Sequence, residues 1–349
     1  MKDTITIGMD LGDRIHFIVV LDEQGNELEA NKVGNTKTAI RKYFDRFKTA
    51  TVVLEAGTHS PWISRELEQM GFTVYVGNPR KLRFIWDSTD KSDERDARML
   101  AMVGRMEPKL LWPVHHRDKQ SHADLTVIKS REVLIKSRTQ LINHARGVVK
   151  STGERLPTCS SASFARRCRE HVPCALWPAL SGVFEIICQL TEQIRHLDRE
   201  IDRLCRERYP ETHHLQQVPG VGPVTSLAYV LSLEEPGRFA KSRQVGPYLG
   251  LTPRRDQSGQ TDRQLRISKA GNKYLRQLLV SCSHYILGPF APDSNLRRHG
   301  LAIAARGGKN ARKRAVVAVA RKLSVLLHRL WADGQEYQPF YGKRIQMAA

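Results

Sequence analysis

The amino-acid sequence predicts an α/β domain, followed by a pair of long helices and then by a basic, mainly α-helical region. Short β-branched segments alternate with amphipathic segments in the first hundred residues. Apolar residues recur every seven residues in the middle of the chain, a pattern typical of helices that pack along one another. The last third is rich in Lys and Arg. We expect domains at residues 1–112, 113–208 and 209–335, with a tail at 336–349.

The length and composition are those of a globular protein. A chain of 349 residues can hold two or three domains, and its 40% hydrophobic and 26% charged residues are ordinary values. Because no window approaches 18 uninterrupted apolar residues and no signal-peptide layout is present, we expect a cytoplasmic protein without membrane contact. The six cysteines are then expected to be reduced. The spacing of Cys159, Cys168, His171 and Cys174 leaves a zinc site open as a weaker alternative.

Positive charge is concentrated near the C-terminus. Residues 1–112 carry 17 Lys and Arg against 17 Asp and Glu, residues 113–240 carry 18 against 14, and residues 241–349 carry 21 against 5. Such a field suits a phosphate backbone and predicts salt-dependent binding of nucleic acid. A solvated basic surface is the alternative for any single residue. The candidate nucleic-acid contacts are Arg254, Arg255, Arg263, Arg266, Lys269, Lys273, Arg276, Arg312, Lys313 and Arg314.

The N-terminal region has a recognisable order of elements. Alternating apolar runs predict strands at residues 4–10, 15–21 and 27–33, followed by a helix near 38–47. A short buried strand at 51–55, a helix at 61–70, a strand at 72–76 and a further helix complete the region. Three strands followed by helix, strand, helix, strand and helix is the order of an RNase H-like fold of the RuvC type.

Four acidic residues of this region are the candidate catalytic residues and metal ligands. Asp10 and Glu55 each end a predicted strand, where ligand sites of open α/β sheets tend to lie. Asp93 and Asp96 are three residues apart, so both carboxylates leave the same face of the last helix. We expect the four carboxylates to converge on a space for two Mg²⁺ ions, which prefer oxygen ligands and support phosphodiester chemistry.

Two other interpretations of these residues stay open at this point. The helix face with Asp93 and Asp96 could simply be solvated and neutralised by Lys91, Arg95 and Arg98. Residues 7–13 also look like the first phosphate loop of actin-like ATPases and sugar kinases. That class of protein needs a second Asp-x-Gly hairpin and a Gly-Gly adenosine loop, and the sequence has no convincing copy of either.

The middle region predicts an antiparallel helical arm of the coiled-coil type. One helix should bury Ile128, Ile135, Ile142 and Val149, and a second helix repeats apolar residues at spacings of four and three. Whether this arm closes on itself or on another subunit stays open. The residues of the second stripe are Val183, Ile187, Leu190, Ile194, Leu197, Ile201 and Leu204.

The last region contains a candidate nucleophile. Ser258 precedes Gly259 in a polar turn among cations, and a serine hydroxyl can accept a phosphoryl group once a base removes its proton. A turn without catalytic role is the common alternative. Ser268 is expected to cap a helix or to contact a phosphate. Residues 218–225 resemble a helix-hairpin-helix loop that binds phosphate through backbone N–H groups, or else form a buried turn.

Taken together, these motifs resemble the transposases of the insertion-sequence-110 family, the bridge-RNA-guided DEDD and serine recombinases. The resemblance covers nearly the whole chain: the acids with their Lys-Ser-Asp-x-x-Asp-Ala context, the heptads, and the C-terminal motifs. These last motifs are residues 219–222, 250–253, 258–259 and 267–272. The chain departs from some relatives, which carry two adjacent hydroxyls where it has Gln257 before Ser258.

The resemblance implies a DNA strand-transfer enzyme. Ser258 would attack DNA to form a covalent phosphoserine, and the acids would bind Mg²⁺ and position the scissile phosphate. A structured bridge RNA would select target and donor DNA, and a homodimer would pair into a tetramer that acts at the bacterial nucleoid. The alternatives are a RuvC-like nuclease or junction resolvase that uses water as its nucleophile, and a non-enzymatic nucleic-acid scaffold.

Overall fold

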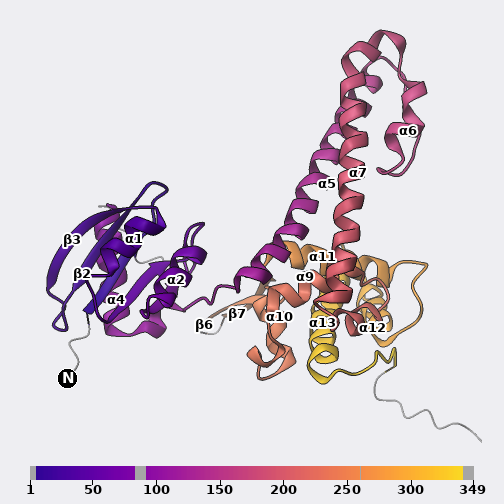
Figure 1. Cartoon of the computed structure of the whole chain (residues 1–349). Coiled ribbons are helices and arrows are strands. Elements are labelled where there is room, and N and C mark those ends of the chain that lie inside the picture. Colours follow the sequence, from indigo (N-terminus) through magenta and orange to yellow (C-terminus); the bar gives the residue numbers. More distant parts are fainter. Residues whose placement is uncertain (1–4, 83–91, 260, 341–349) are drawn as a thin grey trace, which may run out of the picture. The chain divides into compact units, whose positions relative to one another are not determined.

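The computed structural model describes residues 5–82, 92–259 and 261–340 (Figure 1). The chain divides into two compact units, Met1–Asp118 and Lys119–Ala349. The boundary between them lies a few residues beyond the expected one. The predicted arm and the predicted C-terminal region share the second unit, so the division between those two regions stays a prediction.

The first unit is built on a five-stranded sheet of strand order β3-β2-β1-β4-β5. Strand β1 pairs with β2 in the antiparallel sense and with β4 in the parallel sense, and β4 pairs in parallel with β5. The predicted order of strands and helices is confirmed. The elements are β1 (Ile5–Asp10), β2 (Ile15–Leu21), β3 (Glu27–Gly34), α1 (Lys37–Phe44), β4 (Ala50–Glu55), α2 (Ser60–Gln69), β5 (Thr73–Gly77) and α4 (Asp93–Met106).

The two faces of this sheet are covered by different helices. Ile7, Met9 and Ile18 lie on one face with residues of α1 and α2 in the largest core of the unit. The opposite face packs on α4, where Ala97 and Ala101 meet apolar side chains of β2. Alternate residues of a strand point to opposite faces, which is why β2 contributes Ile18 to one core and Val19 to the other.

A helical arm projects from the body of the second unit (Figure 1). Helices α5 (Lys119–Ser151) and α7 (Trp177–Glu207) run side by side, and α6 (Phe164–Cys168) lies at their far end. Ile128, Ile142 and Val149 are buried as predicted, whereas Ile135 is only half-buried. The arm instead buries Arg138, whose Nη1 donates to Thr191 Oγ1 at 3.2 Å.

The arm also contains the one described helix that is long and apolar enough to cross a membrane. By length and composition this is Cys174–Glu207. Its heptad residues Ile187, Ile194, Ile201 and Leu204 are buried in the unit, and α7 packs along α5, so the apolar stripe has a partner within the protein.

The body of the second unit is mainly helical, with one two-stranded hairpin. The fully buried Tyr229 of α9 donates its hydroxyl to the carbonyl oxygen of Ser324 in α13 at the centre of the largest core of the chain. The elements are α8 (Thr212–Gln216), α9 (Pro223–Leu233), α10 (Val245–Tyr248), β6 (Pro253–Ser258), β7 (Thr261–Ile267), α11 (Lys273–Leu287), α12 (Asn295–Ala304) and α13 (Ala311–Asp333).

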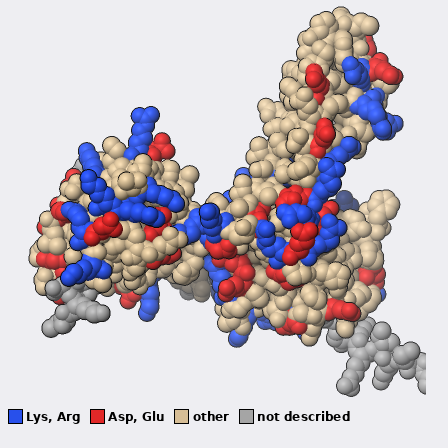
Figure 2. Space-filling view, viewed as in Figure 1, with Lys and Arg blue, Asp and Glu red and all other residues tan. Residues whose placement is uncertain are grey.

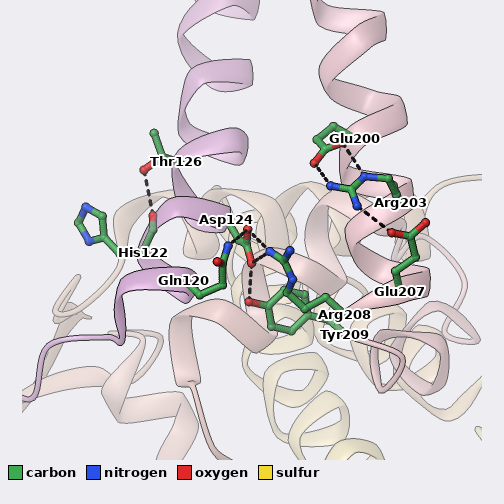
Figure 3. Close-up of polar contacts among 9 residues, drawn as sticks. All are labelled: Gln120, His122, Asp124, Thr126, Glu200, Arg203, Glu207, Arg208 and Tyr209. Carbon is green, nitrogen blue, oxygen red and sulfur yellow. Dashed lines mark hydrogen bonds and ion pairs between the residues drawn. The ribbon is translucent and has the colours of Figure 1, made fainter.

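A buried carboxylate joins the two helices at the base of the arm (Figure 3). Asp124 of α5 accepts hydrogen bonds from Arg208 Nη1 at 2.7 Å and from the Tyr209 hydroxyl at 2.8 Å, just beyond the end of α7. Gln120 donates to the same carboxylate at 3.1 Å. Burial and the acceptor oxygen of Asp124 raise the pKa of Tyr209 to about 12, so the phenol keeps its proton.

We expect Asp124→Ala to lower the free energy of unfolding of the second unit by about 2–3 kcal/mol, since hydrogen bonds to charged groups contribute ~1.5–3 kcal/mol each. The expected loss stays at this level because the Arg208 side chain is 40% exposed and water can solvate it after the change. Urea unfolding measures the effect. Glu207→Ala is the control, because it removes only an exposed ion pair with Arg203 and should change stability by under about 1 kcal/mol. Equal losses in the two variants would contradict a structural role for Asp124.

Candidate active site

Asp10 and Glu55 end neighbouring parallel strands in register. Gly8 of β1 lies beside Val53 of β4, and Met9 lies beside Leu54, so the next residues along the two strands are Asp10 and Glu55. Because side chains alternate between faces, Asp10 points to the same face as Gly8, and Glu55 to the same face as Val53. Both acidic side chains are half-buried.

Helix α4 packs directly on that face. A β-carbon on Gly8 would lie 2.6 Å from the backbone nitrogen of Ala101 and closer still to the carbonyl oxygen of Ala97. Gly104, farther along α4, lies in the same way against the Val53 side chain. The two glycine contacts hold the helix against the centre of the sheet.

The direction of α4 brings its first turn to the end of the sheet where Asp10 and Glu55 lie. Arg105, near the C-terminal end of α4, donates to the carbonyl oxygen of Glu23 at 2.7 Å, in the turn after β2. Because β2 runs antiparallel to β1, that turn is at the opposite end of the sheet from Asp10. The first turn of α4 therefore lies toward the carboxyl ends of β1 and β4.

Asp93 and Asp96 occupy this first turn. Ser92 caps the helix, accepting a hydrogen bond from the backbone N–H of Arg95 at 3.3 Å. Asp93 is exposed and Asp96 is half-buried. Acids at a helix N-terminus also stabilise the helix dipole, so their position alone does not require a metal. The suggestion that Lys91 neutralises this face lies outside the described residues, and Arg98 instead pairs with Glu27.

The donor set suits a hard divalent cation, although the carboxylates do not form a finished cage. The four acids come from adjacent elements, lie on one face at one end of the sheet, and offer only oxygen ligands. Within the described part of the chain, no three His, Cys, Asp or Glu side chains are close enough to hold one metal ion. The four acids thus lie on elements that meet at one end of the sheet, and their role as a metal site stays a prediction.

Asn35 and Gly8 contribute to this edge, and neither is among the residues predicted for the site. Asn35 Nδ2 donates to the carbonyl oxygen of Asp13 at 2.9 Å, which fixes the turn that follows Asp10. His16 lies on the opposite face of the sheet and is fully buried. Burial lowers the pKa of His16, which favours the neutral imidazole. A glycine in the middle of a strand was the available signal for Gly8, because it often marks a close backbone approach.

Ser258 ends strand β6 of an exposed hairpin in the second unit. Asp256 is the cross-strand neighbour of Arg263 in the hairpin. Ser258 lies two residues farther along β6, on the same face as both. The side chains of Arg263 and Ser258 are exposed. Gly259 follows with φ +55°, a conformation that glycine adopts without strain.

The cations predicted around Ser258 differ in their environment. Arg255 points to the other face of the hairpin and pairs with Asp262 at 2.6 Å. Arg276 Nη1 donates to two backbone carbonyl groups, Leu249 at 2.8 Å and Ala270 at 2.7 Å, which indicates a structural role. The other candidates near the hairpin are exposed: Arg254, Arg263, Arg266, Lys269 and Lys273.

Three of the predicted contacts lie where a helix dipole disfavours them. Arg312, Lys313 and Arg314 are exposed in the first turn of α13, which contains no acid. Cations at a helix N-terminus oppose the dipole, so this placement costs stability. A surface for an anionic partner accounts for the arrangement. All ten assignments of nucleic-acid contacts stay predictions.

Two other sequence interpretations change with the structure. Ser268 does not cap α11: Asn272 is the N-cap and accepts from the N–H groups of Tyr274 and Leu275. In the glycine-rich loop before α9, a β-carbon on Gly220 would lie 2.7 Å from the Tyr285 ring, so packing already explains that glycine. Gly220 itself is exposed, so the choice between a phosphate-binding loop and a buried turn stays open.

The candidate zinc ligands do not gather into one group. The sulfur atoms of Cys159 and Cys168 lie 3.6 Å apart near the far end of the arm, whereas Cys174 and His171 are exposed. Among the described residues, no third ligand joins the two sulfurs. Burial and the neighbouring Cys159 raise the pKa of the Cys168 thiol to about 11, so that thiol keeps its proton.

Comparison with known proteins identifies relatives over both units. A family model described as "Transposase" (DEDD type, IS110) matches residues 7–153, and a model described as "Transposase IS116/IS110/IS902 family" matches residues 212–297. The chain is 27% identical to the transposase for insertion sequence element IS1111A of Coxiella burnetii, covering 97% of this chain and 92% of the relative. It is 26% identical to a probable family 20 transposase of Pseudomonas aeruginosa, covering 90% and 92%. The transposase for insertion sequence element IS1328 of Yersinia enterocolitica is 25% identical over 81% and 84% of the two chains.

Proposed function

The chain belongs to the IS116/IS110/IS902 family of transposases and is a DNA transposase, and from this premise we propose that it cuts and rejoins DNA through a serine-linked intermediate. The first unit, an α/β sheet of RNase H-like order, would bind Mg²⁺ through Asp10, Glu55, Asp93 and Asp96. The second unit would supply the nucleophile, Ser258. The observation that carries the proposal is the convergence of the ends of β1 and β4 with the first turn of α4.

The acids would hold and orient the scissile phosphate. Bound Mg²⁺ would supply Lewis acidity toward a phosphoryl oxygen. Asp10 and Glu55 are set by the strand pairing, so their spacing is fixed by the backbone. Asp93 and Asp96 are set by the contact between Gly8 and α4. Divalent metal is the choice that this oxygen donor set favours.

Ser258 would act by phosphoryl transfer. Its oxygen forms a bond to phosphorus while one bond from phosphorus to a deoxyribose oxygen breaks, and the sugar leaves as a hydroxyl that takes up the proton the serine loses. A hydroxyl of a second strand then reverses the step and releases the serine. Arg263, on the same face of the hairpin, would hold the phosphate in place.

The partners follow from the charge of the chain and from the family resemblance. The excess of 21 Lys and Arg over 5 Asp and Glu in residues 241–349 supports contact with target and donor DNA. A structured guide RNA would select those sites, and sequencing the RNA that copurifies with the protein tests this step. Assembly through the arm into a dimer and then a tetramer is part of the proposal, as the family resemblance implies.

We expect the wild-type protein, mixed with element-end DNA and Mg²⁺, to give a protein–DNA adduct that survives denaturation, and Ser258→Ala to give none. The reason is that alanine lacks the oxygen that bonds to phosphorus. Gel mobility and mass spectrometry of the adduct measure the result. Ser268→Ala is the control, because that hydroxyl only accepts from the N–H of Ala270 at 3.4 Å.

Efficient DNA cleavage by Ser258→Ala would overturn the serine mechanism and favour a nuclease that uses water. If the wild type cleaves no DNA under any metal condition, the scaffold alternative would replace both. Adduct formation by Ser258→Ala but not by Ser268→Ala would move the nucleophile to the second serine.

A further inference from the structure

The far end of the helical arm carries an excess of positive charge. We define the arm tip as residues 146–176 and the shaft as residues 119–145 and 177–208. The tip contains six Lys and Arg against two Asp and Glu, whereas the shaft contains ten against eight. In Figure 2, Lys and Arg side chains gather on the visible face near the end of the arm beside a smaller number of acids. The tip cations are Arg146, Lys150, Arg155, Arg166, Arg167 and Arg169.

Ion pairing distinguishes the tip from the shaft. None of the six tip cations pairs with a carboxylate of residues 5–82, 92–259 or 261–340, and the tip itself is described throughout. Several shaft cations are neutralised within the arm. The shaft pairs are Arg131–Asp198, Lys136–Glu132, Arg203–Glu200, Arg203–Glu207 and Arg208–Asp124.

The tip that carries these cations is held in place by hydrogen bonds and aromatic packing. Arg146 Nη1 donates to the carbonyl oxygen of Leu156 at 3.1 Å and Nη2 to that of Pro157 at 2.9 Å, which ties the loop to α5. The Arg146 guanidinium also lies 5.0 Å from the centroid of the fully buried Phe164 ring. Phe164 stacks on Phe184 of α7 with ring centroids 5.3 Å apart. The cations of the short helix α6 are therefore held on a fixed surface.

We propose that the exposed tip cations Lys150, Arg155, Arg166 and Arg167 bind the phosphate backbone of double-stranded DNA, an inference that rests on the proposed function. Cations without acidic partners gain most from phosphate contact, because binding releases the counterions of the DNA. A protein partner fits less well, since no large hydrophobic side chain of the fully described tip is exposed. Transposases act on DNA, and we therefore propose duplex DNA as the partner of the tip.

The test compares two variants that remove the same charge. Arg166→Ala/Arg167→Ala removes two unpaired tip cations, and Lys136→Ala/Arg203→Ala removes two shaft cations that already have acidic partners. All four side chains are exposed, and urea unfolding of each variant checks that the arm stays folded. Affinity for a long DNA duplex is measured between 50 and 200 mM salt by fluorescence anisotropy.

We expect the tip variant to lower the slope of log K against log salt concentration by about 1.8, at about 0.9 per lost phosphate contact. The ratio of wild-type to variant affinity should then shrink by about tenfold across this range. The shaft variant should leave the slope unchanged. An unchanged slope in the tip variant, or an equal drop in both variants, would overturn the proposal.

Two further outcomes separate this inference from the proposed function. A tip variant that loses affinity for the copurified RNA but keeps its affinity for duplex DNA would overturn the proposal in favour of RNA. A tip variant with wild-type DNA binding and normal adduct formation at Ser258 would contradict the tip contact and leave the proposed function unaffected. A wild-type protein that binds no DNA would contradict both the tip contact and the proposed function.

Discussion

Asp10→Asn is expected to slow DNA cleavage at least about a hundredfold at saturating Mg²⁺. A metal acting as a Lewis acid lowers the activation barrier by several kcal/mol, and each ~1.4 kcal/mol is a factor of ten in rate. Asparagine keeps the size of the side chain but offers one neutral oxygen in place of a charged carboxylate.

Asp13→Asn is the matched control for this experiment. Asp13 lies three residues farther along, in the turn after β1, and its exposed carboxylate faces His59 at 3.4 Å. It should change the cleavage rate by less than about fivefold, since one exposed interaction is worth under ~1 kcal/mol and ~1.4 kcal/mol is a factor of ten in rate. Single-turnover cleavage rates across a Mg²⁺ titration measure both variants. Wild-type rates in Asp10→Asn, or equal losses in the two variants, would remove Asp10 from the metal site.

Gly8→Ala should damage both stability and activity although it adds one methyl group. The new β-carbon would lie 2.6 Å from the Ala101 nitrogen and closer to the Ala97 carbonyl oxygen, and backbone atoms cannot rotate away. Overpacking of this kind costs about 1–3 kcal/mol. Since α4 must shift to relieve the clash, Asp93 and Asp96 shift with it, and cleavage should fall further than stability alone explains.

Gly34→Ala is the control for that substitution. Its β-carbon would meet only the Ala39 β-carbon at 3.7 Å, an ordinary contact at the end of β3. Urea unfolding of the first unit and cleavage rates at a temperature where both variants are folded measure the two effects. If Gly8→Ala were as stable and as active as Gly34→Ala, α4 would not depend on this contact.

Local patterns explain why much of the first unit could be predicted. The alternation in β1 and β2 and the helical periods are properties of neighbouring residues, and the elements end within a few residues of expectation. Parallel pairing then follows from the order of the elements, which places Asp10 beside Glu55. The direction of α4 could not be predicted in this way, because it depends on the contact of Gly8 with α4 and on that of Arg105 with the turn after β2.

The second unit shows where local patterns fail. Strand β6 has no alternation of apolar and polar residues and is exposed along its length, so only its pairing with β7 identifies it as a strand. Ser268 and Asn272 are both acceptable helix caps by residue type, and only the structure shows that Asn272 is the one that accepts from the first turn of α11. In the arm, the heptad pattern predicted burial of Ile135, whereas Arg138 is buried because Thr191 of the facing helix offers it an acceptor.

The hydrogen bond between Arg138 and Thr191 sets the register of the two arm helices. If one helix slipped by one heptad, the apolar contacts would stay almost unchanged. The Arg138 guanidinium would then lie among hydrocarbon groups without its acceptor, and its Nε already lacks a partner in the described structure. The arm is thus a spacer of fixed length. With 31 residues in α7 and a rise of 1.5 Å per residue, it spans about 46 Å. That span equals roughly 14 base pairs of duplex, so the two ends of α7 are about that far apart along a DNA molecule lying parallel to the arm.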